Sequence, residues 1–581
     1  MLLSSASNIA LAQQELENRR FKNVLKYAKM AQKEAPASPV PQNLAGIALS
    51  AMLRPTEAVK SFKRAIQLNP SYADARKNLA QTYLLMGQYE SVLLALQSVP
   101  ETPDVLYIKA QGLAALMRKQ EALAAATRYI ADTHEDKKGY KLRAYLRLQF
   151  GLIADALEDY EKVIIIDPLD AETLTLMSLP LARHLRFDDA LRCAQRAVQV
   201  DPANISARLR LAAQFSEMGK TEQSITQYRH VLKLEPSQAV ALKALSEMAK
   251  GEDLAALEPQ VADALSSVSK GSEDEACLLL ARFNIYFHKG KHEQADRDLV
   301  RANNFFAKRS PYNAKKARAS SEEILKRYPD FLPVDQEVRA SPTPIFVLGL
   351  PRSGTTLVEA ILGRNEHVVP LGERGTIGFL LEETIQRGLP FTSREVKALR
   401  DEDIRLLPAL PDDAQAYVDK MPENFRLVGF LKSIYPESKI VNVRRDPRDI
   451  ALSMFQAHFS GAALNYTYNL KAMADHFNLY AHMMSRWHEV FPGQIHDIHY
   501  EALVEDIEGE GSALADYCGL SWSPQMASPN QTDSQILTMS ANQLRRPIHK
   551  QSIGKWRGRQ TLLAPFLQGL DHRLWPEINQ L

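Results

Sequence analysis

A regular spacing of prolines in the first half of the chain constrains the fold most. Pro168, Pro202 and Pro236 are 34 residues apart and end the similar runs I-I-I-D-P, V-Q-V-D-P and L-K-L-E-P. Pro36 and Pro70 show the same interval. A period of this length is typical of helical repeats in which each unit packs only on its neighbours. The first part of the chain is therefore predicted to be an all-α solenoid.

Small residues recur where the two helices of each repeat would cross. When Pro70 is placed at position 32 of a 34-residue unit, Gly46 falls at position 8, Ala58 at position 20 and Ala65 at position 27. Close helix crossings need small side chains, and the proline ends the second helix. The pattern resembles a tetratricopeptide array of roughly eight to nine units over residues 1–308. Such arrays bind a protein or peptide, either a partner or a substrate, in a concave groove, or they pack on another part of the same chain. The sequence leaves both alternatives open.

The length and composition of the chain exclude several classes of protein. A chain of 581 residues is too long for one ordinary core, so we expect at least two domains. The net charge of +2 gives no reason to expect a nucleic-acid partner. No run of about 18 apolar residues is present, so no membrane span is expected. The amino terminus lacks the basic segment of a signal peptide, and three scattered cysteines fit a reducing compartment, so the protein is predicted to be cytoplasmic.

The pattern changes after the repeats. Residues 309–342 contain several prolines around a helical piece at 313–327, and we predict that they form a linker. From residue 343 to 581, strands alternate with helices, which indicates a parallel α/β sheet. The strands are predicted at 345–350, 417–420, 439–443 and 495–500, with a helix at 447–458.

The segment T-P-I-F-V-L-G-L-P-R-S-G-T-T, residues 343–356, reads as a buried strand, a tight loop and the start of a helix. Such a junction directs backbone N–H groups and the positive end of a helix at one point, which favours an anion. Gly349 and Gly354 have the spacing of a P-loop, but Thr355 replaces the lysine of nucleoside-triphosphate enzymes, and Arg352 is the cation. The loop is predicted to hold phosphate without kinase chemistry, although an ordinary strand–loop–helix turn fits it as well.

A second candidate lies in the stretch V-R-R-D-P-R-D-I-A-L-S, where a strand meets a helix. Arg445 ends the strand and Ser453 lies in the helix. A guanidinium group binds phosphate through two parallel hydrogen bonds, and a hydroxyl adds a third. A charged strand end at the surface is the alternative interpretation.

Together these motifs resemble the sulfotransferase superfamily. The match consists of P-R-S-G-T-T after a strand, R-D-P-R-D-x-x-x-S about 90 residues later, and a late G-K-W, and it covers about 343–560. The arginine in the loop makes the tyrosylprotein sulfotransferases the most similar group. With the repeats, the chain resembles bacterial tetratricopeptide-repeat sulfotransferases. The resemblance implies a P-loop-like α/β domain that moves the sulfuryl group of 3′-phosphoadenosine-5′-phosphosulfate to an acceptor hydroxyl.

The resemblance also implies which residues form the catalytic site. Glu373 matches the general base, Arg352 and Lys420 match groups that stabilise the transferring sulfuryl group, and Ser540 matches a second stabiliser. Arg374, beside the base, is expected either to orient an acidic substrate or to lie in solvent. No metal is expected, because the lysine–hydroxyl signature that accompanies magnesium is missing.

The nucleotide site implied by the resemblance draws on several segments. The loop contributes Arg352, Ser353, Gly354, Thr355 and Thr356; Arg445 and Ser453 match the pair that holds the 3′-phosphate; and Tyr500, Gln543 and Lys555 complete the set. Ala457 replaces a second 3′-phosphate arginine, so the pocket is expected to be less basic than in the family.

Several functions remain compatible with the sequence. A protein or peptide acceptor, with tyrosine as one candidate, is favoured because repeats of a peptide-binding type precede the α/β domain. A carbohydrate or lipid acceptor is the alternative within the same reaction. A repeat scaffold with a non-catalytic nucleotide domain, and a P-loop kinase or nucleotidase, are alternatives from other classes.

Overall fold

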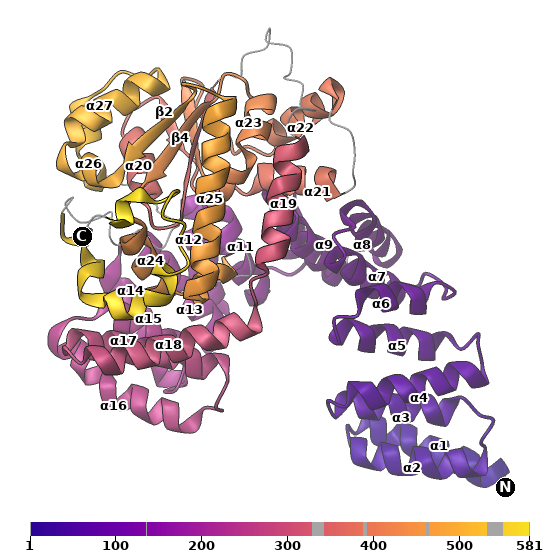
Figure 1. Ribbon diagram of the computed structural model, residues 1–581. Helices are drawn as coiled ribbons and strands as arrows, with labels where there is room; N and C mark the ends of the chain where they lie inside the picture. The colour runs from indigo at the N-terminus through magenta and orange to yellow at the C-terminus, as the bar shows by residue number, and fades with distance from the viewer. Residues whose placement is uncertain are drawn as a thin grey trace. The chain divides into compact units, whose positions relative to one another are not determined.

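The computed structural model describes residues 2–134, 136–327, 342–386, 392–459, 464–531 and 550–579. By its internal contacts the chain divides into two compact units, Met1–Pro168 and Leu169–Leu581. Each unit is described separately below (Figure 1).

The first unit is entirely helical in its described part, and consecutive helices pack against each other in pairs. Its helices are α1 (Leu2–Glu17), α2 (Phe21–Glu34), α3 (Val40–Ala51), α4 (Pro55–Leu68), α5 (Ala73–Leu85), α6 (Tyr89–Leu96), α7 (Pro103–Ala115), α8 (Lys119–Thr133), α9 (Lys137–Gln149) and α10 (Ile153–Ile166).

The second unit continues this helical pattern before its sheet begins. Its first helices are α11 (Ala171–Arg183), α12 (Phe187–Val200), α13 (Ile205–Glu217), α14 (Thr221–Leu234), α15 (Ala239–Met248), α16 (Gly251–Ser267), α17 (Glu273–His288), α18 (His292–Arg309) and α19 (Ala314–Arg327). The predicted helical repeat region is therefore confirmed.

The small residues of the repeat pattern lie where helices meet. Ala58 and Ala65 of α4 are 0% exposed, and Gly46 of α3 is buried against Phe62 of α4. α4 ends two residues before Pro70, as expected from the loss of a backbone donor at proline. The 34-residue period thus reflects repeated close packing of paired helices.

The second unit contains a five-stranded, fully parallel sheet with the order β2-β3-β1-β4-β5. The strands are β1 (Thr343–Gly349), β2 (Val368–Pro370), β3 (Ala416–Lys420), β4 (Lys439–Arg444) and β5 (Ile495–His499). All four predicted strands are present. The sequence analysis missed β2, because three residues ending in proline form too short a run to stand out.

Further helices connect and cover these strands. They are α20 (Thr355–Leu362), α21 (Thr376–Gln386), α22 (Ser393–Arg405), η2 (Pro422–Leu427), α23 (Val428–Ile434), α24 (Pro447–Gln456), η3 (Asn465–Tyr468), α25 (Leu470–Val490), α26 (Tyr500–Glu505), α27 (Ile507–Cys518), η4 (Pro524–Ala527), η5 (Pro529–Gln531), η6 (Lys550–Ser552), η7 (Lys555–Arg559), α29 (Gln560–Leu567) and η8 (Pro576–Asn579).

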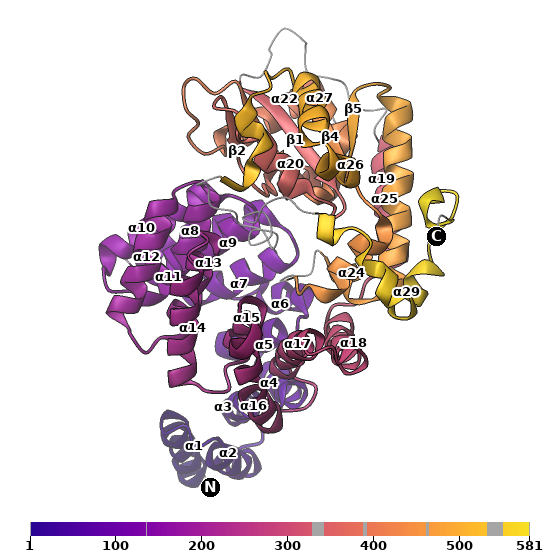
Figure 2. The same cartoon turned by 90° about the vertical axis from the view of Figure 1, so that its left-hand side faces the viewer.

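The sheet is buried on both faces, which explains the continuous apolar run of β1. Ile345 and Val347 share a hydrophobic cluster with α20 and α27, whereas Phe346 and Leu348 share another with α23 and α25. The two sets of helices lie on opposite sides of the strands (Figures 1 and 2). The α/β domain is therefore a three-layer structure.

The hydrophobic core of the second unit is continuous from the repeats into the α/β domain. One cluster contains residues of α13 to α18 together with residues of α23, α24, α25 and α29. α19, in the predicted linker, packs on α25, and Arg318 forms an ion pair with Asp475. The boundaries proposed from the sequence, 1–308, 309–342 and 343–581, stay predictions.

Among the described residues, no helix combines the length and the apolar character needed to cross a bilayer.

The close approach of α3 and α4 leads to a test of the repeat packing. A Cβ atom at Gly46 would lie 2.5 Å from Cε1 of Phe62, so Gly46→Ala should force the ring to move. We expect a loss of about 1–3 kcal/mol in the free energy of unfolding of the repeats, measured by urea denaturation. Lys60→Ala, an exposed change in the same helix pair, is the control. Equal unfolding midpoints for the two variants would contradict the packing argument.

Candidate functional site

The strand order directs three chain segments to one edge of the sheet. β1 lies between β3 and β4, and the chain moves first to the β2–β3 side and only later to β4. In such sheets ligands bind outside the carboxyl ends of the strands, where the direction of winding changes. Val347 pairs with Lys420, and Gly349 pairs with Val443. The loop after β1, Lys420 and the segment that follows β4 therefore meet at the same edge.

The loop after β1 has a backbone shape that depends on its glycines. Gly349 has φ = 145°, and a Cβ there would lie 2.6 Å from the carbonyl oxygen of Val443. Gly354 has φ = 114°, and a Cβ there would lie 2.6 Å from Cδ2 of Tyr500. Arg352 itself adopts φ = 69°, a region that costs a non-glycine residue free energy. The loop is held tightly between β4 and Tyr500.

The loop presents polar groups suited to an anion. Ser353 is 0% exposed, and its hydroxyl has no hydrogen-bond partner within the part of the chain that the structure describes. Thr355 and Thr356 are buried at the start of α20, where backbone N–H groups lack partners within the helix. A buried hydroxyl without a partner is costly, and a phosphate or sulfate oxygen would satisfy it.

Two guanidinium groups meet beside this loop. Nε of Arg352 donates to Oγ of Ser453 at 3.0 Å, and Arg445 donates to the backbone oxygen of Arg352 at 3.1 Å. Burial, together with the charge of Arg445, lowers the pKa of Arg352 to about 10. The two positive charges are thus unfavourable for each other, and an anion bound between them would offset that cost. The structure brings together Arg352, Arg445 and Ser453, three residues of the predicted nucleotide site.

Tyr500 closes this cluster from the start of α26. The guanidinium group of Arg445 lies 4.5 Å from the centre of its ring. The hydroxyl of Tyr500 hydrogen-bonds Oγ of Ser552 at 2.8 Å, and Arg445 donates to the backbone oxygen of Ser552 at 2.6 Å. The sequence analysis missed Ser552, although it lies three residues before the lysine of the G-K-W motif.

A second pair of predicted residues lies at the carboxyl end of β3. Nζ of Lys420 donates to Oε1 of Glu373 at 2.6 Å. The side chain of Lys420 is 0% exposed, whereas that of Glu373 is 46% exposed. The carboxylate can therefore reach a molecule from solvent while its buried partner fixes its position.

Glu359 holds the segment that carries Glu373, and the sequence analysis missed it. It lies in α20, is 7% exposed, and accepts the backbone N–H of Gly372 at 2.8 Å. The same glycine accepts the backbone N–H of Lys420 at 2.9 Å through its carbonyl oxygen. Burial raises the pKa of Glu359 to about 7. A charged residue within the apolar helix that follows the loop was the available signal.

Arg374 is buried, so the expectation of a solvated side chain is wrong. It is 7% exposed and donates to Oδ1 of Asp403 at 2.8 Å. Asp403 also accepts the hydroxyl of Tyr435 at 2.8 Å, and Asp419 lies 3.8 Å from the guanidinium group. The charge of Arg374 is therefore engaged with buried carboxylates, which anchor the chain directly after Glu373, rather than offered to an acidic substrate.

The remaining predicted residues are not assembled by the structure. Ser540 and Gln543 lie outside the described residues. Lys555 is exposed at the start of η7, and no hydrogen bond or ion pair joins it to another described residue of the predicted site. Its neighbours Gly554 and Trp556 donate their backbone N–H groups to Asp449 of α24.

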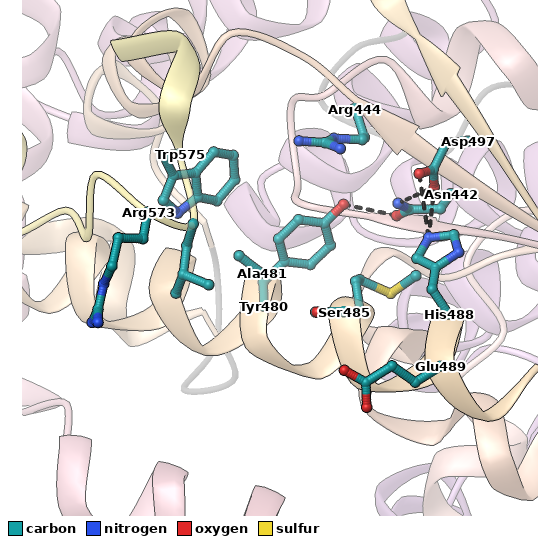
Figure 3. A pocket seen from close by; sticks show the side chains of 12 residues that line it. Asn442, Arg444, Tyr480, Ala481, Ser485, His488, Glu489, Asp497, Arg573 and Trp575 are labelled. Atoms are coloured by element: carbon teal, nitrogen blue, oxygen red, sulfur yellow. Dashed lines mark hydrogen bonds and ion pairs between the residues drawn. The ribbon is translucent and has the colours of Figure 1, made fainter. Parts of the chain in front are cut away.

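A separate pocket of about 490 Å³ lies on the α25 side of the sheet (Figure 3). Tyr480 donates to Oδ1 of Asn442 at 2.7 Å, and the amide of Asn442 donates to Asp497 at 2.7 Å. Arg444 lines this pocket and forms an ion pair with Glu577. Arg444, which ends β4, and Arg445, which follows it, therefore have different surroundings: Arg444 lines this pocket, and Arg445 contacts the loop. Within the described ranges, no group of three metal-ligating side chains was found.

Comparison with known proteins identifies both parts of the chain. Residues 344–524 match the sulfotransferase family, and residues 51–116 match the tetratricopeptide repeat. The two resemblances seen in the sequence are thereby confirmed for these segments.

Individual relatives are similar to parts of the chain at low identity. An uncharacterized protein of Aquifex aeolicus (strain VF5) is 26% identical over 448 residues, which are 73% of this chain and 58% of the relative. The chain thus spans little more than half of that protein. A putative protein-tyrosine sulfotransferase of Caenorhabditis briggsae is 26% identical over 39% of this chain and 88% of its own. Protein-tyrosine sulfotransferase 2 of Gallus gallus is 22% identical over 45% of this chain and 72% of its own. A solved repeat protein, YrrB, is 20% identical, covers 31% of this chain and 95% of its own, and has a TM-score of 0.27.

The buried carboxyl group of Glu359 predicts a pH dependence of stability. Its pKa is raised from 4.5 to about 7, so the folded protein keeps the proton to a higher pH than the unfolded chain does. The stabilisation is present below pH 4.5 and is lost as the pH rises through about 7. Glutamine does not titrate, so Glu359→Gln should gain about 1–3 kcal/mol relative to wild type between pH 5 and pH 8.

Urea denaturation of both proteins at the two pH values measures this difference. Glu508→Gln, at an exposed position of α27, should show no such change. Parallel pH curves for wild type and Glu359→Gln would mean that this carboxyl group does not titrate in the expected range.

Proposed function

We propose that the protein transfers a sulfuryl group from 3′-phosphoadenosine-5′-phosphosulfate to an acceptor hydroxyl, with a protein or peptide as acceptor. The main support is the cluster of Arg352, Arg445 and Ser453 around the loop, beside the Glu373–Lys420 pair at the end of the neighbouring strand. The sulfotransferase match over residues 344–524 gives independent support.

The residues of the loop fit the phosphosulfate donor. The buried hydroxyl of Ser353 needs an acceptor, and the backbone N–H groups at the start of α20 favour an anion. Arg445 and Ser453 are assigned to the 3′-phosphate, in line with the family resemblance. The ring of Tyr500, packed over Gly354, limits the space beside the loop. Gln543 and Lys555 are retained as nucleotide contacts, and Ser540 as a second stabiliser, on the resemblance alone.

The transfer requires one bond to form and one to break. The acceptor oxygen attacks sulfur, the bond between sulfur and the bridging phosphate oxygen breaks, and the acceptor proton passes to the Glu373 carboxylate. A tyrosine hydroxyl with a pKa near 10 needs such a base at neutral pH. Negative charge grows on the leaving phosphate, where Lys420 and Arg352 are assigned to stabilise it. We propose that no metal takes part.

The acceptor is assigned to proteins on two grounds. The repeats are of a type that binds peptides, and two relatives are named protein-tyrosine sulfotransferases. Tyrosine is therefore the first residue to test, and carbohydrate and lipid hydroxyls are the alternatives. The cytoplasmic location and the bacterial origin stay predictions from the sequence.

Nucleotide binding tests the donor site. Calorimetric titration of wild type with 3′-phosphoadenosine 5′-phosphate should show tighter binding than ATP with magnesium. Arg445→Ala loses charge-assisted hydrogen bonds and should therefore lower the affinity for the bisphosphate by about 10- to 100-fold. Arg444→Ala removes the adjacent arginine, which lines the other pocket, and should change the affinity less than threefold. A preference for ATP, or equal effects of the two variants, would reject the assignment.

Glu373 is tested by separating catalysis from nucleotide binding. Glu373→Gln should lower kcat for transfer of radiolabelled sulfate by about 10²–10⁴, with the bisphosphate affinity unchanged, because a general base acts only on the acceptor proton. Glu366→Gln, with a side chain 86% exposed, is the matched control. Peptides with tyrosine, carbohydrates and lipids are offered in parallel as acceptors. Bisphosphate binding without transfer to any of them would favour the non-catalytic scaffold.

A further inference from the structure

The last helix of the repeats contacts the helix that carries Ser453. Asn303 of α18 is 2% exposed, and its amide donates to the carbonyl oxygen of Phe455 at 2.9 Å. The same amide donates to the carbonyl oxygen of Leu299 at 3.0 Å, one turn earlier in its own helix. Both hydrogen bonds are buried, and the one to Phe455 connects two segments 152 residues apart without competition from solvent.

The position of Phe455 gives this contact a specific effect. Phe455 lies in the last turn of α24, where backbone carbonyl groups receive no hydrogen bond from N–H groups of the same helix. Asn303 supplies the missing donor from outside. Ser453, which accepts the hydrogen bond of Arg352, is two residues earlier in the same turn. The amide of Asn303 therefore fixes the end of α24 that carries Ser453.

A second contact links α18 to the segment that follows Ser552. Arg559, at the end of η7, has a side chain only 7% exposed and forms an ion pair with Asp296 of α18. Its guanidinium group also lies 5.3 Å from the ring centre of Phe287 in α17. A buried guanidinium group is costly without such a partner, so this pairing helps to hold η7 against α18.

The two elements that α18 contacts, α24 and η7, also contact each other. η7 is joined to α24 by the backbone N–H groups of Gly554 and Trp556, which donate to Asp449 at 2.6 and 3.1 Å. A ring contact adds to these polar contacts, because Phe306 of α18 stacks on His458, just after α24, with ring centres 4.4 Å apart. α18, α24 and η7 thus hold one another, and two of them carry groups of the candidate nucleotide site.

We propose that α18 belongs to the framework of the nucleotide site, with Asn303 and Asp296 as positioning residues for Ser453 and for the Ser552 segment. The identity of the ligand in this inference rests on the proposed function. The repeats then have a role at the active site in addition to any partner that they bind.

The first experiment measures the framework itself and needs no ligand. Hydrogen–deuterium exchange of the full chain should show faster exchange of residues 447–456 and 550–559 in Asn303→Ala than in wild type. Asn204→Ala is the matched control, because Asn204 caps α13 within the same repeats and the same unit. Unchanged exchange of α24 in Asn303→Ala would overturn the inference, whether or not the wild type binds the bisphosphate.

The second experiment asks whether the framework acts on the 3′-phosphate. Asn303→Ala should weaken binding of 3′-phosphoadenosine 5′-phosphate by about tenfold, and binding of AMP, which lacks the 3′-phosphate, by less than twofold. Partial unfolding would instead reduce the binding stoichiometry for both ligands alike. Asp296→Asn is an isosteric change in the contact between α18 and η7. It should reproduce the selective loss of bisphosphate affinity if Asn303→Ala folds poorly.

The outcomes separate the two proposals. If the wild type does not bind the bisphosphate, the proposed function is rejected. The exchange data would still show whether Asn303 holds α24 in place. A wild type that binds the bisphosphate, with Asn303→Ala and Asp296→Asn binding equally well, rejects the positioning role and leaves the proposed function intact.

Discussion

The pairing of β1 with β3 on one side and β4 on the other is the constraint on which the site depends. All strands are parallel, so the carboxyl ends of these three strands share one edge. Lys420 ends β3, the loop from Gly349 to Gly354 follows β1, and Arg445 follows β4. A shift in the register of either pair would separate these groups, because side chains on a strand alternate between faces. The buried apolar residues on both faces of β1 hold that register.

Several charged side chains are buried or close to a like charge at this edge of the sheet, which is electrostatically unfavourable. Arg352 and Arg445 lie close together, Lys420 is fully buried, and Glu359 is buried with a raised pKa. Groups with perturbed pKa values are common at functional sites, since burial and neighbouring charges make them responsive to a ligand. The two sets of charges differ in role. An anion between the arginines would offset their mutual repulsion, whereas Glu359 holds the chain that presents Glu373.

The repeats and the α/β domain share more than a covalent connection. The hydrophobic cluster that runs from α13 to α25 passes through the predicted boundary at residues 309–342. The polar contacts of Asn303 and Asp296 lie at the rim of this shared core. A repeat array that only recruited a partner would not need a buried amide directed at α24. The geometry therefore joins the last repeat helix and the candidate nucleotide site in one compact unit.

The sequence by itself determined the features that depend on local pattern. The 34-residue period predicted the repeats, four strand patterns predicted four of the five strands, and the motifs around Arg352, Arg445 and Ser453 drew attention to residues that lie together in the structure. Period, apolar runs and glycine spacing are properties of neighbouring residues, so they are visible before folding. The catalytic roles assigned to Glu373 and Lys420 stay predictions, although the two residues do form a pair.

Only the tertiary structure decided which polar side chains support that cluster. Glu359 reaches Gly372, Arg374 turns inward to Asp403, Tyr500 meets Ser552, and Asn303 meets Phe455, at separations from 13 to 152 residues. Each side chain is polar and would suit a surface position as well as a buried one. What distinguishes the two is a partner from a distant segment, because burial without a partner is costly in free energy. No local pattern of residues records where such a partner will be.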